Sequence, residues 1–226
     1  MMKHRIHIIL TFCLLTFLTP QAKALPQAKA QAQSPAEALL TKAAEKYRQS
    51  KGVAATFSIE TTDNDGSSIA SIEGQIHLQD NRFYLEVPDE MKAWFDGQNL
   101  WTLLINAQEV NLSTPAQEEL LMLNPVNVFM LYQHGFQCQM LKEKTFGKKT
   151  LCGVEMRPQD AGSDIRSIRV YFEKSLLQPV SISIVNSNAT KSDISITKYQ
   201  TDRNYPLSFF LFPQKDYPMV EVIDLR

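Results

Sequence analysis

Histidine and cysteine are the side chains of this sequence best suited to catalysis or metal binding, and neither occurs in a typical pattern. His77 and His134 are the histidines beyond the N-terminal segment, and neither belongs to a His-Glu-x-x-His motif. Cys138 and Cys152 lack the Cys-x-x-Cys spacing of a zinc or redox site. The sequence therefore predicts no metal site, and His77, which lies in an alternating segment, is expected to face solvent.

Nucleophilic and acid–base chemistry also have no local signature. The chain contains no Gly-x-Ser-x-Gly elbow and no glycine-rich phosphate loop. Its Asp and Glu residues mostly fall in turns or at outward positions of alternating segments. We therefore interpret the protein as a non-enzyme without a cofactor. A hydrolase would require a polar dyad assembled from distant strands.

The N-terminus is typical of a secretory signal peptide. Lys3 and Arg5 precede an apolar run from Ile6 to Leu18, and a small-residue site ends at Ala24. A retained membrane anchor is the alternative, but a spanning helix needs roughly 20 apolar residues, more than this run provides. We expect residues 1–24 to be cleaved and the Ala/Gln/Lys-rich residues 25–33 to form a flexible lead-in.

The charge of the mature chain excludes one large class of partner. After cleavage it would carry 20 Lys and Arg residues against 24 Asp and Glu residues, a net charge of −4. A protein that follows nucleic-acid phosphates needs a clustered excess of basic residues. We therefore expect no nucleic-acid partner, and nothing in the sequence requires more than a monomer.

The cysteines have different expected fates. Cys13 follows the bulky Phe12 inside the apolar run, which argues against lipidation at that residue. Cys138 and Cys152 flank residues 142–150, which contain Gly147 and are typical of a hairpin turn. Because an exported chain enters an oxidising compartment, we predict a disulfide between them. Two buried thiols that pack as small hydrophobic groups are the alternative.

One helix is clearly indicated, beginning at Ser34. Ser34, Pro35 and Glu37 form a helix start with an N-cap, a first-turn proline and a capping-box acid. Apolar residues follow at helical spacing as far as Tyr47, and Gly52 ends the element.

From Val53 the apolar residues recur with a period of two, which predicts β-strands separated by Gly, Asn and Asp turns. The turn at Asp96-Gly97 is typical of a hairpin. Two short helices, beginning at Thr114 and at Asn124, interrupt the pattern. Strands are expected at 149–157, 165–173, 179–186 and 191–200, with a last pair near 208–212 and 219–224. The sum is about eleven strands and three helices in one domain, 34–226, of mainly-β, α+β class.

A curved antiparallel sheet has a concave face that side chains fill or leave open as a cavity. The short helices of 115–132 are apolar enough for one side to cover such a face. For each large apolar residue, core packing is the alternative to lining a cavity. The residues expected to line the cavity and its covering helices are Phe57, Ile59, Phe83, Leu85, Trp94, Trp101, Leu121, Val128, Phe129 and Tyr132.

Several patterns together resemble the LolA family of periplasmic lipoprotein carriers. They are the strand 53–59 continuing to Gly74-Gln75-Ile76, the hairpin 94–101 with its Asp-Gly turn before Leu-Trp, the Asn124-Pro125 helix start, and the ending 209–213 followed by 220–224. The similarity covers nearly the whole mature chain. The hairpin and the ending are its most distinctive parts.

The resemblance implies a half-open antiparallel β-barrel with short helices as a lid over an apolar cavity. It also implies a carrier in the periplasm of a Gram-negative bacterium. In that family the cavity takes the acyl chains of lipoproteins from an inner-membrane ABC transporter and delivers them to an outer-membrane acceptor. The family's lid latch is an Arg-Pro pair, where this chain has Asp80-Asn81, so Arg82 is the residue that would replace the latch arginine.

Two further functional classes fit the same sequence. One is a half-barrel that binds a different apolar ligand, such as a free lipid or a glycolipid. The other is a half-barrel whose interior is filled and whose surface binds or senses proteins. The exported hydrolase is the last alternative.

Overall fold

The computed structural model describes residues 33–116, 120 and 127–226, and residues 33–226 form one compact unit. The expected signal peptide, the lead-in as far as residue 32, and the first of the two short helices apart from Leu120 lie outside the described residues. So do Leu121 and the Asn124-Pro125 helix start.

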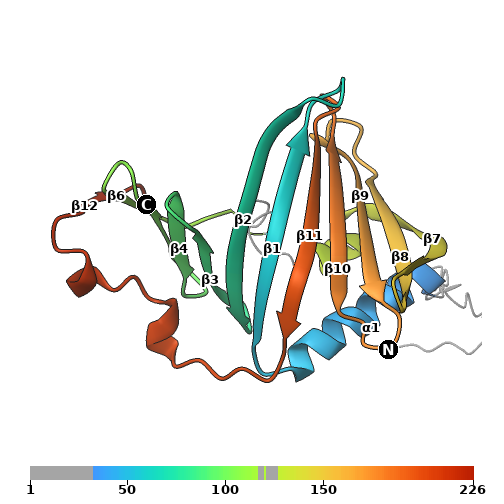
Figure 1. Ribbon diagram of the computed structural model, residues 1–226, viewed down its shortest axis with the longest axis horizontal. Helices are drawn as coiled ribbons and strands as arrows, with labels where there is room; N and C mark the ends of the chain where they lie inside the picture. The colour runs from blue at the N-terminus through green and yellow to red at the C-terminus, as the bar shows by residue number, and fades with distance from the viewer. Residues whose placement is uncertain (1–32, 117–119, 121–126) are drawn as a thin grey trace, which may run out of the picture. The chain divides into compact units, whose positions relative to one another are not determined.

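The described residues form a single sheet of twelve strands that is not closed (Figure 1). Its order is β12-β6-β5-β4-β3-β2-β1-β11-β10-β9-β8-β7. The strands in the first half of the sequence are β1 (Val53–Thr62), β2 (Ser68–Gln79), β3 (Arg82–Val87), β4 (Met91–Phe95), β5 (Leu100–Leu104) and β6 (Glu109–Ser113). Those in the second half of the sequence are β7 (Phe136–Phe146), β8 (Lys149–Pro158), β9 (Ile165–Glu173), β10 (Pro179–Asn186), β11 (Lys191–Gln200) and β12 (Glu221–Asp224).

The mainly-β prediction is confirmed, with three corrections. Twelve strands are present instead of about eleven, and β12 pairs with β6 in parallel, so the sheet is not purely antiparallel. The strand expected at 208–212 is the 3-10 helix η2 (Leu207–Phe210). Pro206 and Pro213 bracket this stretch, and proline cannot donate a hydrogen bond to a strand ladder.

The helix α1 (Pro35–Gln49) begins as the sequence predicts. The Glu37 amide donates to Ser34 Oγ at 3.2 Å, and the Ser34 amide donates to Glu37 Oε2 at 2.8 Å, which completes a capping box. Its apolar side, centred on the fully buried Leu40, packs into a core with β8, β9 and β10 and with the 3-10 helix η1 (Asn127–His134). This core covers the inner face of the sheet at β8, β9 and β10.

The opposite face of β3, β4 and β5 is covered by the tail, defined here as residues 201–220. Trp94 is buried there, with its ring centroid 5.4 Å from that of Phe212 and 6.1 Å from that of Tyr217. The tail also reaches His77, whose Nδ1 lies 2.9 Å from the Tyr205 hydroxyl in a hydrogen bond. The prediction that His77 faces solvent is therefore wrong, because the chain returns over this face after β11.

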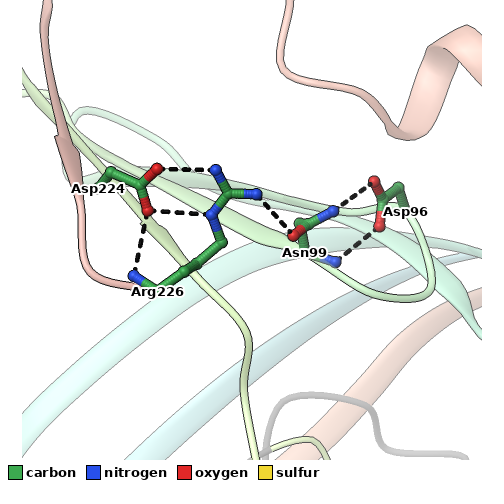
Figure 2. A network of polar contacts seen from close by, with 4 residues as sticks. All are labelled: Asp96, Asn99, Asp224 and Arg226. Carbon is green, nitrogen blue, oxygen red and sulfur yellow. Dashed lines mark hydrogen bonds and ion pairs between the residues drawn. The ribbon is translucent and has the colours of Figure 1, made fainter.

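Residues 224–226 are fastened to the β4–β5 turn by the polar network in Figure 2. Arg226 donates to both carboxylate oxygens of Asp224, at 2.9 and 2.7 Å, and to Asn99 Oδ1 at 3.2 Å. The backbone amide of Asn99 in turn donates to Asp96 Oδ1 at 2.7 Å. The Arg226 hydrogen bonds lower the pKa of Asp224 to about 2, so this carboxylate stays charged in all but strong acid.

The predicted disulfide does not form, because the hairpin turns between Phe146 and Lys149 and this register does not place the two cysteines opposite each other. Cys138 and Cys152 are both free thiols, although β7 and β8 do form the expected hairpin. Cys138 lies opposite Met156, four residues along β8 from Cys152, an offset of about 13 Å at 3.3 Å per residue. Disulfides need Cα atoms about 4.4–6.8 Å apart. The alternative of thiols that pack as small hydrophobic groups fits Cys152, which is buried.

Thiol titration tests this correction. Protein purified without reductant and then denatured should react at both Cys138 and Cys152 with a maleimide, because no bond ties the two sulfurs. Peptide mass spectrometry reads each position separately. Recovery of a linked Cys138–Cys152 peptide from freshly purified protein would contradict the register described above.

A second test concerns the tail. Trp94→Ala should lower the free energy of unfolding by about 3–5 kcal/mol, because a large buried ring is removed from the tail contact. Limited proteolysis within 201–220 should become faster. Trp101→Ala is the matched control, since this half-buried ring loses less area. Equal losses for the two variants would mean that the tail does not anchor on Trp94.

Candidate functional site

The candidate site is an apolar pocket of about 240 Å³ on the inner face of the sheet. Its floor comes from β1, β2, β3 and β11, its rim from Met91 and Pro179, and one wall from Phe129 of η1. The lining residues are hydrophobic apart from the phenol of Tyr199. The pocket can therefore exclude water but offers little for orienting a polar substrate.

Strand register explains why these side chains converge. Ile59 lies opposite Ile72 on β2 and opposite Ile194 on β11. Two residues earlier on β1, Phe57 lies opposite Ile196. Because alternate residues of a strand point to the same face, each of the three strands contributes a row of apolar side chains to one surface.

Gly74 sets the position of the Phe57 ring. A Cβ at Gly74 would lie 2.7 Å from Phe57 Cζ and 2.7 Å from the Glu86 carbonyl oxygen. Only a residue without a side chain allows the ring to lie across β2 at this point. The pocket's floor therefore depends on a glycine opposite Phe57 in the β1–β2 ladder.

The helix η1 joins the pocket to the core under α1. Phe129 is 1% exposed and its ring centroid lies 5.1 Å from that of Phe172 on β9. Val128 and Leu131 are buried in the same core. On the α1 side, the Tyr132 hydroxyl and Thr41 Oγ1 share a hydrogen bond of 2.9 Å.

The electrostatics of the pocket suit an uncharged ligand segment. Burial raises the pKa of Tyr199 to about 12, so its phenol is neutral at physiological pH. No acidic or basic side chain occurs among the described residues that line the pocket. A charged group would therefore lose its hydration here without gaining a partner.

The structure brings together some of the predicted residues. Phe57, Ile59, Leu85 and Phe129 line the pocket, and Phe83 is buried in the adjoining core. Val128 and Tyr132 belong to the core under α1 instead. Their role in ligand binding remains a prediction.

Trp94 and Trp101 are not at the pocket, which corrects the sequence-based placement. They pair with each other across β4 and β5, on the face that the tail covers. The alternation in 91–95 carries the signal for this, since Met91, Ala93 and Phe95 share the inner face and leave Trp94 on the outer one. The size of a side chain does not show which face of the sheet it lies on, because a large ring packs equally well under the tail.

The sequence prediction missed most of the pocket. These residues are aliphatic or small members of the same alternating rows, apart from the phenol of Tyr199, and β11 supplies three of them. The missed lining residues are Ala55, Ile72, Ile76, Leu78, Val87, Met91, Pro179, Ile194, Ile196 and Tyr199. Nothing in the sequence shows that β1 and β11, more than a hundred residues apart, are neighbours.

Arg82, the predicted latch residue, lies on the tail side of the sheet. Its guanidinium forms an ion pair with Asp80 and lies 5.5 Å from the centre of the Phe210 ring. The Phe210 contact ties β3 to the tail, whereas η1 is tied to α1 through the Tyr132 hydroxyl. The latch role stays a prediction without a contact that supports it.

The rest of the described chain offers little for other chemistry. No group of three or more His, Cys, Asp or Glu residues is placed to hold a metal in residues 33–116, 120 and 127–226. Over the same ranges, no buried side-chain N or O atom lacks a hydrogen-bond partner. None of the helices described has the length and apolar character needed to cross a membrane.

Gly74→Ala tests how the pocket floor is built. The added methyl group must push Phe57 toward the cavity, so we expect the free energy of unfolding to fall by about 1–3 kcal/mol. Gly162→Ala is the matched control, since a Cβ there meets only Asp160, with Oδ1 the nearest atom at 3.4 Å. Chemical denaturation measures both. Parent-like stability of Gly74→Ala would mean that Phe57 does not rest on this glycine.

Several solved structures are similar to this chain at low sequence identity, and one of them, with a TM-score above 0.5, shares its fold. An uncharacterized conserved protein from Thermus thermophilus matches with a TM-score of 0.59 and 11% identity, over 84% of this chain and 99% of that one. A LolA superfamily protein from Nitrosomonas europaea matches with a TM-score of 0.44 and 11% identity, over 78% and 97%. The lipoprotein LppX of Mycobacterium tuberculosis matches with a TM-score of 0.45 and 13% identity, over 76% and 97%.

The family is shown by sequence. No curated protein matches the chain significantly. The family described as outer membrane lipoprotein carrier protein LolA, in contrast, matches residues 27–188, well over half of the chain. The resemblance seen in the sequence is thereby confirmed, and the chain belongs to the LolA family.

Proposed function

We propose that this protein is a periplasmic carrier that binds the acyl chains of lipoproteins in its apolar pocket and shuttles them from the inner to the outer membrane. The observation that carries this proposal is the uncharged pocket beside Phe129. Each methylene group removed from water contributes about 0.8 kcal/mol. A soluble carrier therefore needs such a surface to hold a membrane anchor.

In this proposal η1 acts as part of a lid. The pocket of about 240 Å³ is smaller than the roughly 300–1,000 Å³ typical of ligand sites. Cargo with several acyl chains therefore requires η1 to move away from the sheet. Exposing Val128, Phe129 and Leu131, all nearly fully buried, would cost roughly 1.5–3 kcal/mol each.

The cargo itself offsets that cost. About ten buried methylene groups contribute about 8 kcal/mol, which is comparable to the sum for the three lid side chains. The free energy of moving η1 away from the sheet is therefore close to zero when cargo is present and unfavourable when it is absent. Such a balance allows both loading and release, as a shuttle requires.

The proposed route follows from family membership. The chain would leave the cytoplasm by its signal peptide, receive lipoproteins from an inner-membrane ABC transporter and pass them to an outer-membrane acceptor. It would act as a monomer in a Gram-negative periplasm. No catalytic step and no cofactor enter this scheme.

Ile59→Asp tests the carrier function. Ile59 lies on the pocket floor, half-buried, so the carboxylate would be desolvated by any bound chain. Loss of affinity for a triacylated lipoprotein should be at least about 100-fold. Native mass spectrometry of the mature protein co-expressed with that lipoprotein measures complex formation.

Ser58→Asp is the matched control, because the neighbouring residue points to the other face of the same strand. It should bind lipoprotein as the parent does. A parent protein that binds no lipoprotein but retains a free lipid or glycolipid would replace the proposal with that ligand class. A parent that retains neither would favour the filled half-barrel that binds proteins through its surface.

A further inference from the structure

The sheet has a gap in its wall between β10 and β11. Their pairing begins at Ser181 and Ser195 and runs only toward Val185 and Lys191. The rest of β11, from Ile196 to Gln200, pairs with β1 on its other side but with no residue of β10. The two strands part toward the end at which β11 finishes (Figure 1).

An open groove of about 800 Å³ lies at this gap. Pro179, Ile196 and Tyr199 line this groove and also line the inner apolar pocket. The two spaces are therefore separated only by shared side chains at the point where the backbone ladder stops. The groove and the inner pocket are therefore neighbours across one layer of side chains, away from η1.

The outer part of the groove is basic. Lys144, Lys148 and Lys149 line it, and the carboxylate among the described lining residues is that of Glu173. Glu173 is already paired with Lys149 at 2.6 Å. The groove therefore carries a surplus of positive charge beside an apolar opening.

The Lys144 ammonium group lies against an aromatic ring. Its Nζ lies 3.5 Å from the centre of the Tyr171 ring. That ring lies flat across β8 because Gly153 has no side chain, and a Cβ there would come within 2.6 Å of Tyr171 Cδ1. At the rim, Phe146 is 68% exposed. The rim thus combines a cation that lies over the Tyr171 ring with the exposed ring of Phe146.

We propose that the gap between β10 and β11 is a binding site for an anionic lipid. Its acyl chain passes between the strands into the apolar pocket, and its headgroup rests on Lys144, Lys148 and Lys149. The inference rests on the proposed acyl-binding function of the pocket. It adds a second ligand class and an entrance distinct from the lid.

Charge reversal tests the headgroup site. We compare the full mature chain with the variant Lys144→Glu, Lys148→Glu, Lys149→Glu and with the control Lys42→Glu, Lys51→Glu, Lys215→Glu, which has the same net charge. The probes are palmitoyl lysophosphatidylglycerol and palmitoyl lysophosphatidylcholine, which share one acyl chain, measured by calorimetry below their micelle concentrations. The groove variant should bind the anionic probe about tenfold more weakly than the parent and bind the zwitterionic probe equally well. The control should match the parent with both.

A bulky side chain tests the route. Val180→Trp narrows the groove, whereas Val185→Trp makes the same change at the paired end of the same strand. Val180→Trp should slow association and dissociation of the anionic probe about tenfold at nearly constant Kd. Val185→Trp should keep the parent rates, measured by stopped-flow fluorescence.

The outcomes separate the two proposals. Equal affinity of the groove variant and the control for the anionic probe overturns the headgroup site, and unchanged rates in Val180→Trp overturn the route. If lipoprotein binding remains sensitive to Ile59→Asp in either case, the carrier function stands alone. A parent chain that binds neither lysolipid nor lipoprotein overturns both.

Discussion

The structure depends on one constraint: an unclosed sheet that has apolar side chains on both faces needs cover on both. The inner face is covered by α1 and η1, with Leu40 and Phe129 at the centre of the contact. The outer face of β3, β4 and β5 is covered by the tail through Phe212 and Tyr217. A small closed barrel would fill its interior with the side chains of its own strands. An open one leaves an interior that a helix covers, and the pocket is the part left unfilled.

Much of the fold follows from period-two alternation, which places the strands at 165–173, 179–186 and 191–200 where the structure has them. Such local patterns cannot show which strands are neighbours, so the β1–β11 pair that forms the pocket floor was not predictable. They also do not fix the register of the β7–β8 hairpin, which places Cys138 opposite Met156 and not opposite Cys152. The tail is irregular and bracketed by prolines, so its role as a cover has no periodic signal.

In the proposed complex, the pocket and the outer groove bind different parts of one lipid. An amphiphile needs a dry space for its chain and a wet, charged surface for its head, and these cannot share one wall. In this protein Pro179, Ile196 and Tyr199 form the boundary between them. The place where the β10–β11 ladder ends thus determines where such a boundary can exist.

The parallel pairing of β12 with β6 has a consequence for biosynthesis. Among the described strands β12 is the last to be synthesised, and Arg226, just after it, bonds to Asn99 in the β4–β5 turn (Figure 2). Until the tail and β12 have left the ribosome, the edge of β6 stays unpaired and Trp94 stays uncovered. An emerging chain therefore cannot complete its fold early. Delayed folding would suit the proposed export, because translocation across a membrane requires a chain that is still extended.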